Sequence, residues 1–162
     1  MVRFLHNFLA EETMNANDVM TANPACCTSK TSLREVAGMF VEHDCGAIPV
    51  VNDLVKRWPV GIVTDRDIVC RVTALGKNAL EMTAGDCMSA PCITVPPDTS
   101  LDGCCEIMES NKVRRILVVD ESGACCGVIS QADVALRGKE NKAAEVVKEV
   151  SRPTTAPSAV SL

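Results

Sequence analysis

Two short turns in the sequence each bring a hydroxyl side chain and a carboxylate together. The segments GIVTDRD (61–67) and GVISQAD (127–133) share a glycine, two aliphatic residues, a hydroxyl residue and an aspartate three positions later. The hydroxyl–carboxylate pairs are Thr64 with Asp67 and Ser130 with Asp133. Hydroxyls both donate and accept hydrogen bonds, and carboxylates accept them, so such pairs can bind a polar ligand. We predict that the two turns hold a ligand between them.

The same spacing also has a purely structural interpretation. A Ser or Thr followed three residues later by an acidic residue is close to a capping box, which stabilises the first turn of a helix. Capping and ligand binding can coexist at one turn. The turns alone therefore leave both roles open.

The elements around the two turns repeat along the chain. In the first half, apolar residues with helical spacing begin at Leu33, strands are expected at 47–51 and 59–63, and a helix is expected from about 65 to 75. Most of this pattern returns 68 residues later, and the final turn returns after 66. Such self-similarity indicates duplicated units of strand, helix, strand, strand and helix.

The expected organisation has five parts. They are an N-terminal helix at 1–15, a first repeat at 16–79, a second repeat at 80–138, a C-terminal helix at 139–150 and a disordered tail at 151–162.

Composition excludes several classes of function. The chain has 162 residues, a formal net charge of −5 and a pI of about 5.0, whereas surfaces that bind nucleic acid backbones are strongly basic. The chain has three Phe, one Trp and no Tyr, which argues against a base-stacking platform as the main function. Without a long apolar run or a signal peptide, we expect a soluble cytoplasmic protein.

Ten cysteines require an explanation. In the expected cytoplasmic setting they are reduced thiols, and the doublets at 26–27, 104–105 and 125–126 lack the usual zinc spacing. Several cysteines align with apolar residues of the other repeat, which favours core packing over redox or metal sensing. His6 and His43 are isolated in the sequence. We therefore predict no metal site, no catalytic residues and no enzymatic activity.

The repeated pattern resembles a tandem pair of CBS domains, also called a Bateman module. The resemblance covers about residues 16–138 and is carried by a series of short matching segments. These are Val19-Met20-Thr21, the strand at 46–51, the two turns described above and the strand at 113–120. It implies an α/β fold in which two pseudo-symmetric repeats pack through small sheets. With little else in the chain, it is similar to stand-alone bacterial signalling proteins, which include hypoxic-response proteins.

The resemblance also implies a regulatory function and a ligand. Family members commonly bind adenine nucleotides in the cleft between repeats, so AMP, ADP or ATP is expected, NAD or S-adenosylmethionine is possible, and no cofactor is required. A homodimer is also expected, with no nucleic acid or membrane partner and an unknown downstream protein. The alternatives are a redox or metal sensor that uses the cysteine doublets and an interaction module that needs no nucleotide.

The implied pockets combine residues of both repeats. The first would contain Thr64, Arg66, Asp67, Cys92, Ile93, Val113 and Arg114. The second would contain Ser130, Ala132, Asp133, Met20, Ala25, Cys45, Gly46 and Ala47. Arg114 and Arg115 are expected to lie nearest the first pocket and to face phosphates, because the guanidinium group suits phosphate. Since the repeats differ at these positions, the two pockets should differ in affinity.

Overall fold

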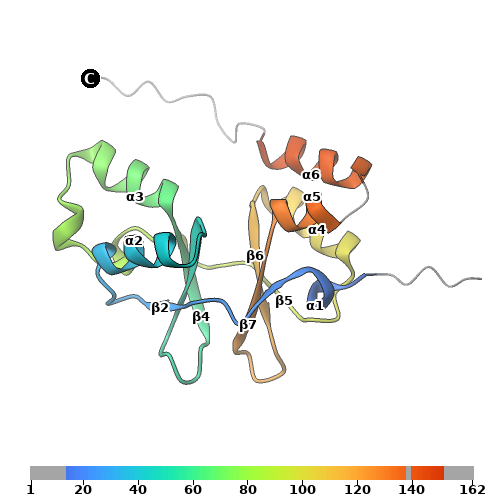
Figure 1. The fold of residues 1–162 in the computed structure, drawn as a ribbon, viewed down its shortest axis with the longest axis horizontal. Helices are drawn as coiled ribbons and strands as arrows, with labels where there is room; N and C mark the ends of the chain where they lie inside the picture. Colours follow the sequence, from blue (N-terminus) through green and yellow to red (C-terminus); the bar gives the residue numbers. More distant parts are fainter. Residues whose placement is uncertain (1–13, 138–139, 152–162) are drawn as a thin grey trace, which may run out of the picture.

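A computed structural model describes residues 14–137 and 140–151 of the chain (Figure 1). The first repeat contains β2 (Cys27–Thr28), α2 (Leu33–Glu42), β3 (Ala47–Val51), β4 (Pro59–Thr64) and α3 (Asp65–Arg71). The second contains β5 (Thr94–Val95), α4 (Leu101–Asn111), β6 (Arg115–Val119), β7 (Cys125–Ser130) and α5 (Gln131–Arg137). The predicted α/β class and the order of elements in each repeat are confirmed. Short 3-10 turns connect the repeats at Thr73–Leu75, Ala79–Glu81 and Ala84–Asp86.

The helices begin where the sequence supplies caps. At α2, the Ser32 side chain accepts a hydrogen bond from Glu35 N, and the Glu35 carboxylate accepts one from Ser32 N. At α4, Ser100 Oγ accepts from Gly103 N. The helix expected over 65–75 is shorter, because α3 ends at Arg71 and the buried Val72 has non-helical backbone angles.

The segment that precedes each repeat packs on the other repeat. Helix α1 (Ala16–Val19) buries both its terminal residues in the core of the second repeat, and β1 (Thr21–Ala22) pairs antiparallel with β7. The resulting sheets have the orders β1-β7-β6-β5 and β2-β3-β4. In the same way, Ala84 and Cys87 belong to the core of the first repeat. The chain therefore crosses between the repeats at 23–26 and crosses back after Ser89, which bridges to Ile62.

The two sheets meet in a small apolar interface cluster. Its members are Val51, Leu117, Cys125, Cys26, Ile62, Cys92 and Val128. Because the burial of apolar side chains stabilises such contacts, this cluster holds the repeats together.

The C-terminal helix α6 (Glu140–Ser151) covers the second repeat only, where it lies beside α4 and α5 (Figure 1). Ala143, Val146 and Val150 are buried in that repeat's core, while Val147 is 40% exposed. The expected N-terminal helix and C-terminal tail lie outside the described residues, apart from their innermost positions. Within the described part of the chain, no helix is both long and apolar enough to cross a membrane.

Candidate ligand site

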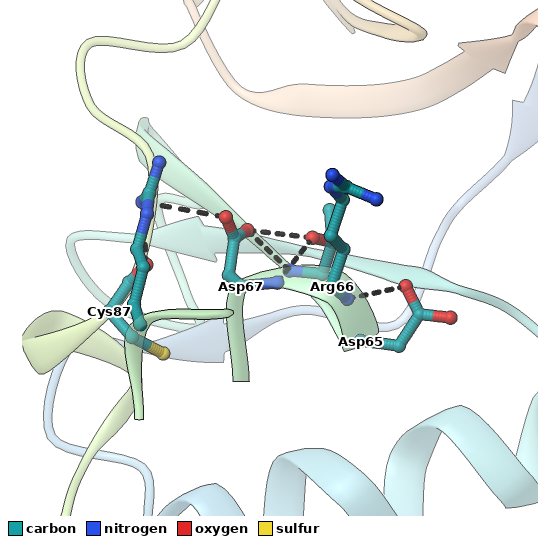
Figure 2. A network of polar contacts seen from close by, with 6 residues as sticks. Asp65, Arg66, Asp67 and Cys87 are labelled. Atoms are coloured by element: carbon teal, nitrogen blue, oxygen red, sulfur yellow. Dashed lines mark hydrogen bonds and ion pairs between the residues drawn. The ribbon is translucent and has the colours of Figure 1, made fainter. Parts of the chain in front are cut away.

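The first turn is a closed hydrogen-bond network. Oδ2 of Asp67 accepts bonds from Thr64 N at 2.9 Å and Thr64 Oγ1 at 2.8 Å. Its Oδ1 lies 3.4 Å from Nη1 of Arg71, which also donates to the Cys87 carbonyl at 2.8 Å. Figure 2 shows the Asp67 carboxylate at the centre of this network, between Cys87 and Asp65. Because both carboxylate oxygens have protein partners and Asp67 is buried, this turn fulfils the structural role of a helix cap.

The second turn repeats half of this network. Oδ2 of Asp133 accepts from Ser130 N at 2.8 Å and from Ser130 Oγ at 2.6 Å. Arg137, which corresponds to Arg71, instead donates to the carbonyl of Asp18 at 3.0 Å. Among the described residues, Oδ1 of Asp133 therefore has no protein partner. This oxygen is available to accept hydrogen bonds from a ligand.

The glycine that opens each turn is required by close packing. A Cβ added at Gly61 would lie 2.8 Å from Sδ of Met88, and a Cβ at Gly127 would overlap the side chain of Met20. Each methionine belongs to the segment that crosses from the other repeat. Met20, expected in the second pocket, instead packs on β7 and on the second core.

A cavity of about 450 Å³ lies at the second turn. Seven residues of the predicted second pocket line it: Ala25, Cys45, Gly46, Ala47, Ser130, Ala132 and Asp133. Further lining comes from Thr21, Ala22, Asn23, Pro24, His43, Asp44, Ile48, Arg115 and Val128. The segment that crosses between the repeats forms one wall, so both repeats contribute to the cavity.

Arg115 does not follow the predicted assignment. It was expected nearest the first pocket, but it lines the cavity of the second. The strand register explains this, because Arg115 pairs directly with Ser130 across β6 and β7. Its guanidinium extends towards Gly46, where an added Cβ would lie 3.0 Å from Nη2. Arg114 is exposed and is not among the residues that line this cavity.

The other residues of the first predicted pocket have varied surroundings. Cys92 belongs to the interface cluster, and Ile93 and Val113 pack against the core of the second repeat. Arg66 is exposed, and its side chain extends away from Asp65 in Figure 2. The role of these residues in ligand binding stays a prediction.

Sequence reasoning missed the two segments that complete the cavity. Residues 21–24 follow the predicted Met20, while His43 and Asp44 precede the predicted Cys45. Asn23 and Asp44 have positive φ angles of 49° and 46°, which turn the chain sharply at the cavity. Asn and Asp tolerate this conformation better than most residues, so these two residue types were the available signal.

All ten cysteines are free thiols, and five of them are buried. Burial raises the pKa of Cys27 to about 12 and that of Cys104 to about 11, so both are protonated at neutral pH. Within 14–137 and 140–151, no three or more His, Cys, Asp or Glu side chains gather into a possible metal site.

Comparison with known proteins defines the class. The family model for the CBS domain matches twice, at residues 16–73 and 84–139. The chain therefore belongs to the CBS domain family and is a tandem CBS pair.

Among curated relatives, the chain is similar to hypoxic response protein 1 of Mycobacterium tuberculosis, with 31% identity over 138 residues, or 85% of this chain and 94% of that one. It is 36% identical over 117 residues to the uncharacterized protein MK0525 of Methanopyrus kandleri, which covers 72% of this chain but only 56% of that relative.

Two solved structures show the same fold. A structure of Hypoxic Response Protein I with two coordinated zinc ions has a TM-score of 0.67 and 31% identity, and the match covers 76% of this chain and 98% of that one. The CBS pair of protein MJ0100, in complex with 5′-methylthioadenosine and S-adenosyl-L-methionine, has a TM-score of 0.67 and 24% identity over 76% of this chain and 94% of that one.

Proposed function

We propose that this CBS pair is a regulatory module that binds an adenine nucleotide in the cavity at Ser130 and Asp133. The observation that carries the proposal is a cavity of about 450 Å³ that combines an arginine, apolar walls and a carboxylate oxygen that has no partner among the residues that the structure describes. Small-molecule sites are typically clefts of about 300–1,000 Å³ with mostly apolar linings and few polar groups.

Each part of a nucleotide has a suitable partner in this cavity. Oδ1 of Asp133 would accept hydrogen bonds from the ribose hydroxyls, which are strong when the acceptor is charged. Arg115 would bind phosphate through its planar guanidinium group. Ala25, Ile48 and Val128 would pack against the adenine ring. No catalytic step is part of this function.

The ligands of MJ0100 support an adenosine compound, because both contain adenosine. Neither of them carries phosphate, whereas Arg115 gives the present cavity a phosphate-binding group. We therefore favour AMP, ADP or ATP over S-adenosylmethionine, with NAD as a further candidate. Since both repeats line the cavity, a ligand that prefers one relative position of the repeats would shift the protein towards it.

Calorimetric titration with AMP, ADP, ATP, NAD and S-adenosylmethionine tests this function. Arg115→Gln should weaken the binding of phosphate-bearing ligands by about tenfold or more, because it removes a charged hydrogen-bond donor. Arg114→Gln is the matched control and should change affinity by less than about twofold, since a rim charge contributes little. Absence of binding at millimolar concentration, or unchanged affinities in Arg115→Gln, would refute the proposal.

A homodimer is part of the same proposal. Helices α2 and α3 of the first repeat expose Val41 at 84% and Val69 at 57%, and no helix of the described part of the chain covers them as α6 covers α4 and α5. Exposed apolar side chains on adjacent helices favour association with another protein surface. A second copy of the chain is the partner that we propose.

A further inference from the structure

A cluster of two thiols and one arginine lies beside the cavity. Nη2 of Arg57 donates a hydrogen bond to Sγ of Cys26 at 3.3 Å and another to the Pro24 carbonyl at 2.8 Å. Its Nε donates to the carbonyl of Cys125 at 3.2 Å. The Cys26 and Cys125 side chains both belong to the apolar interface cluster, and each of them shifts the pKa of the other. The two cysteines come from different doublets and from opposite sides of the interface between the sheets.

The backbone holds Arg57 firmly in this position. Arg57 N donates to the Asp53 carbonyl at 3.0 Å, and its own carbonyl accepts from Cys125 N at 2.8 Å. Its φ of 56° lies in the left-handed region that favours glycine, and the corresponding residue of the second repeat is Gly123, with φ of 82°. The first repeat therefore places a large cationic side chain where the second repeat has none.

The two thiols of the cluster have opposite properties. Interaction with the Cys125 side chain and the charge of Arg57 lower the pKa of the Cys26 thiol, although burial opposes them. Interaction with the Cys26 side chain and burial raise the pKa of the Cys125 thiol, which stays protonated. Cys26 is half-buried, whereas Cys125 is buried. A thiol of lowered pKa beside a second thiol is the arrangement of an oxidisable pair.

We propose that Cys26 and Cys125 are a hydroperoxide-reactive pair that forms a disulfide between the two repeats. The Cys26 thiolate attacks the hydroperoxide, so that an S–O bond forms, the O–O bond breaks and an alcohol or water leaves after taking up a proton. Cys125 then loses its proton and attacks the Cys26 sulfur, the S–O bond breaks and water leaves. The two thiols together supply the two electrons that reduce the hydroperoxide.

The pair can be tested without any nucleotide, so the outcome is independent of the proposed ligand. The full-length reduced protein is treated with hydrogen peroxide and mapped after tryptic digestion under non-reducing conditions. Trypsin leaves Cys26 with Cys27 in the peptide 4–30 and Cys125 with Cys126 in the peptide 116–137. The adjacent cysteines therefore provide matched controls.

The disulfide-linked peptides 4–30 and 116–137 should form in the wild type, in Cys27→Ala and in Cys126→Ala. They should be lost in Cys26→Ala and in Cys125→Ala. A link that persists without Cys26 or Cys125, or that never forms in the wild type, would overturn the proposal.

Arg57 gives a second test that leaves both thiols in place. In the Cys27→Ala background, Cys26 should react with iodoacetamide at pH 7 at least about tenfold faster than Cys27 does in Cys26→Ala. Arg57→Gly copies Gly123 and should slow Cys26 alkylation by about tenfold, because an opposite charge near a thiolate favours it. Arg57→Lys keeps the charge and should retain most of the rate. Equal rates of Cys26 alkylation with Arg57 unchanged, in Arg57→Gly and in Arg57→Lys would contradict the assigned role of Arg57.

Discussion

The two repeats carry the same turn but complete it differently. At Thr64, the carboxylate of Asp67 is fully engaged, because Arg71 binds the oxygen that the capping box leaves free. At Ser130, the equivalent arginine binds the carbonyl of Asp18 instead, and Asp133 keeps one oxygen for another partner. One duplicated motif can therefore serve as a cap in one repeat and as a cap with binding capacity in the other.

The helical faces of the two repeats also differ, because only that of the second repeat is covered by another helix of the described chain. Helix α6 buries residues against α4 and α5 of the second repeat, so that Cys105 is buried where the aligned Ala37 of α2 is exposed. The corresponding face of the first repeat has no such cover among the described residues and presents Val41 and Val69. The C-terminal helix thus makes the second repeat a closed unit and leaves the first with an apolar face.

The largest expected effect comes from removing this cover. Val146 is fully buried in α6, so Val146→Asp should lower the free energy of unfolding by roughly 3 kcal/mol or more, because an unpaired charge replaces buried apolar surface. Val147→Asp, one residue away and 40% exposed, should change it by less than about 1 kcal/mol. Urea denaturation measures both. Equal losses would show that α6 does not dock through the Val146 face.

The two aspartates should separate binding from capping. Asp133→Asn should weaken nucleotide binding by about tenfold to a hundredfold, since a charged hydrogen bond contributes about 1.5–3 kcal/mol. The apo protein should stay folded. Asp67→Asn should lower apo stability by about 1–2 kcal/mol, because it weakens a buried cap and its Arg71 contact. It should change affinity by less than about threefold.

Calorimetry and thermal unfolding of both variants make this comparison. If Asp67→Asn weakens binding as much as Asp133→Asn, the two turns hold equivalent sites, and the contrast between them is wrong.

The exposed face of the first repeat should control association. Val41→Glu places a charge at the proposed dimer interface and should raise the dimer dissociation constant by about tenfold or more. Val55→Glu is the control, because Val55 is 92% exposed but lies on the turn between β3 and β4, away from α2 and α3. Sedimentation equilibrium distinguishes them. A wild-type protein that stays monomeric at all concentrations would exclude the homodimer.

The sequence predicted the repeat fold well because duplication doubles every weak signal. The order of strands and helices was visible in the aliphatic runs and their 66–68-residue spacing, and the cavity retains seven of the eight predicted second-pocket residues. The directions in which individual side chains point could not be predicted from the sequence. Met20 packs on Gly127, and the pairing of Arg115 with Ser130 depends on strand register, which spacing along one strand does not determine.

The thiol pair shows the same limit at longer range. Adjacent residues of a strand point to opposite faces, so neither doublet could place its own two thiols together. Cys26 and Cys125 meet because the N-terminal segment crosses between the repeats. That crossing is a property of the folded pair and has no signature in either repeat alone.

The smallest expected effect is a reciprocal exchange in the two cores. Cys104 and its counterpart Val36 are both fully buried, so Cys104→Val and Val36→Cys should each change the free energy of unfolding by less than about 1.5 kcal/mol at pH 7. A larger effect of these substitutions on the free energy of unfolding should be measurable only at high pH. Burial raises the Cys104 pKa from 9.0 to about 11, so the native state holds its proton where the unfolded state has lost it. The stability that this provides is complete below pH 9 and is lost as the pH rises through about 11. In urea denaturation, the free energy of unfolding of Cys104→Val should therefore rise relative to that of the wild type between pH 9 and 11. That of Val36→Cys should fall relative to the wild type over the same range. A difference independent of pH would mean that Cys104 is more open to solvent than its packing indicates.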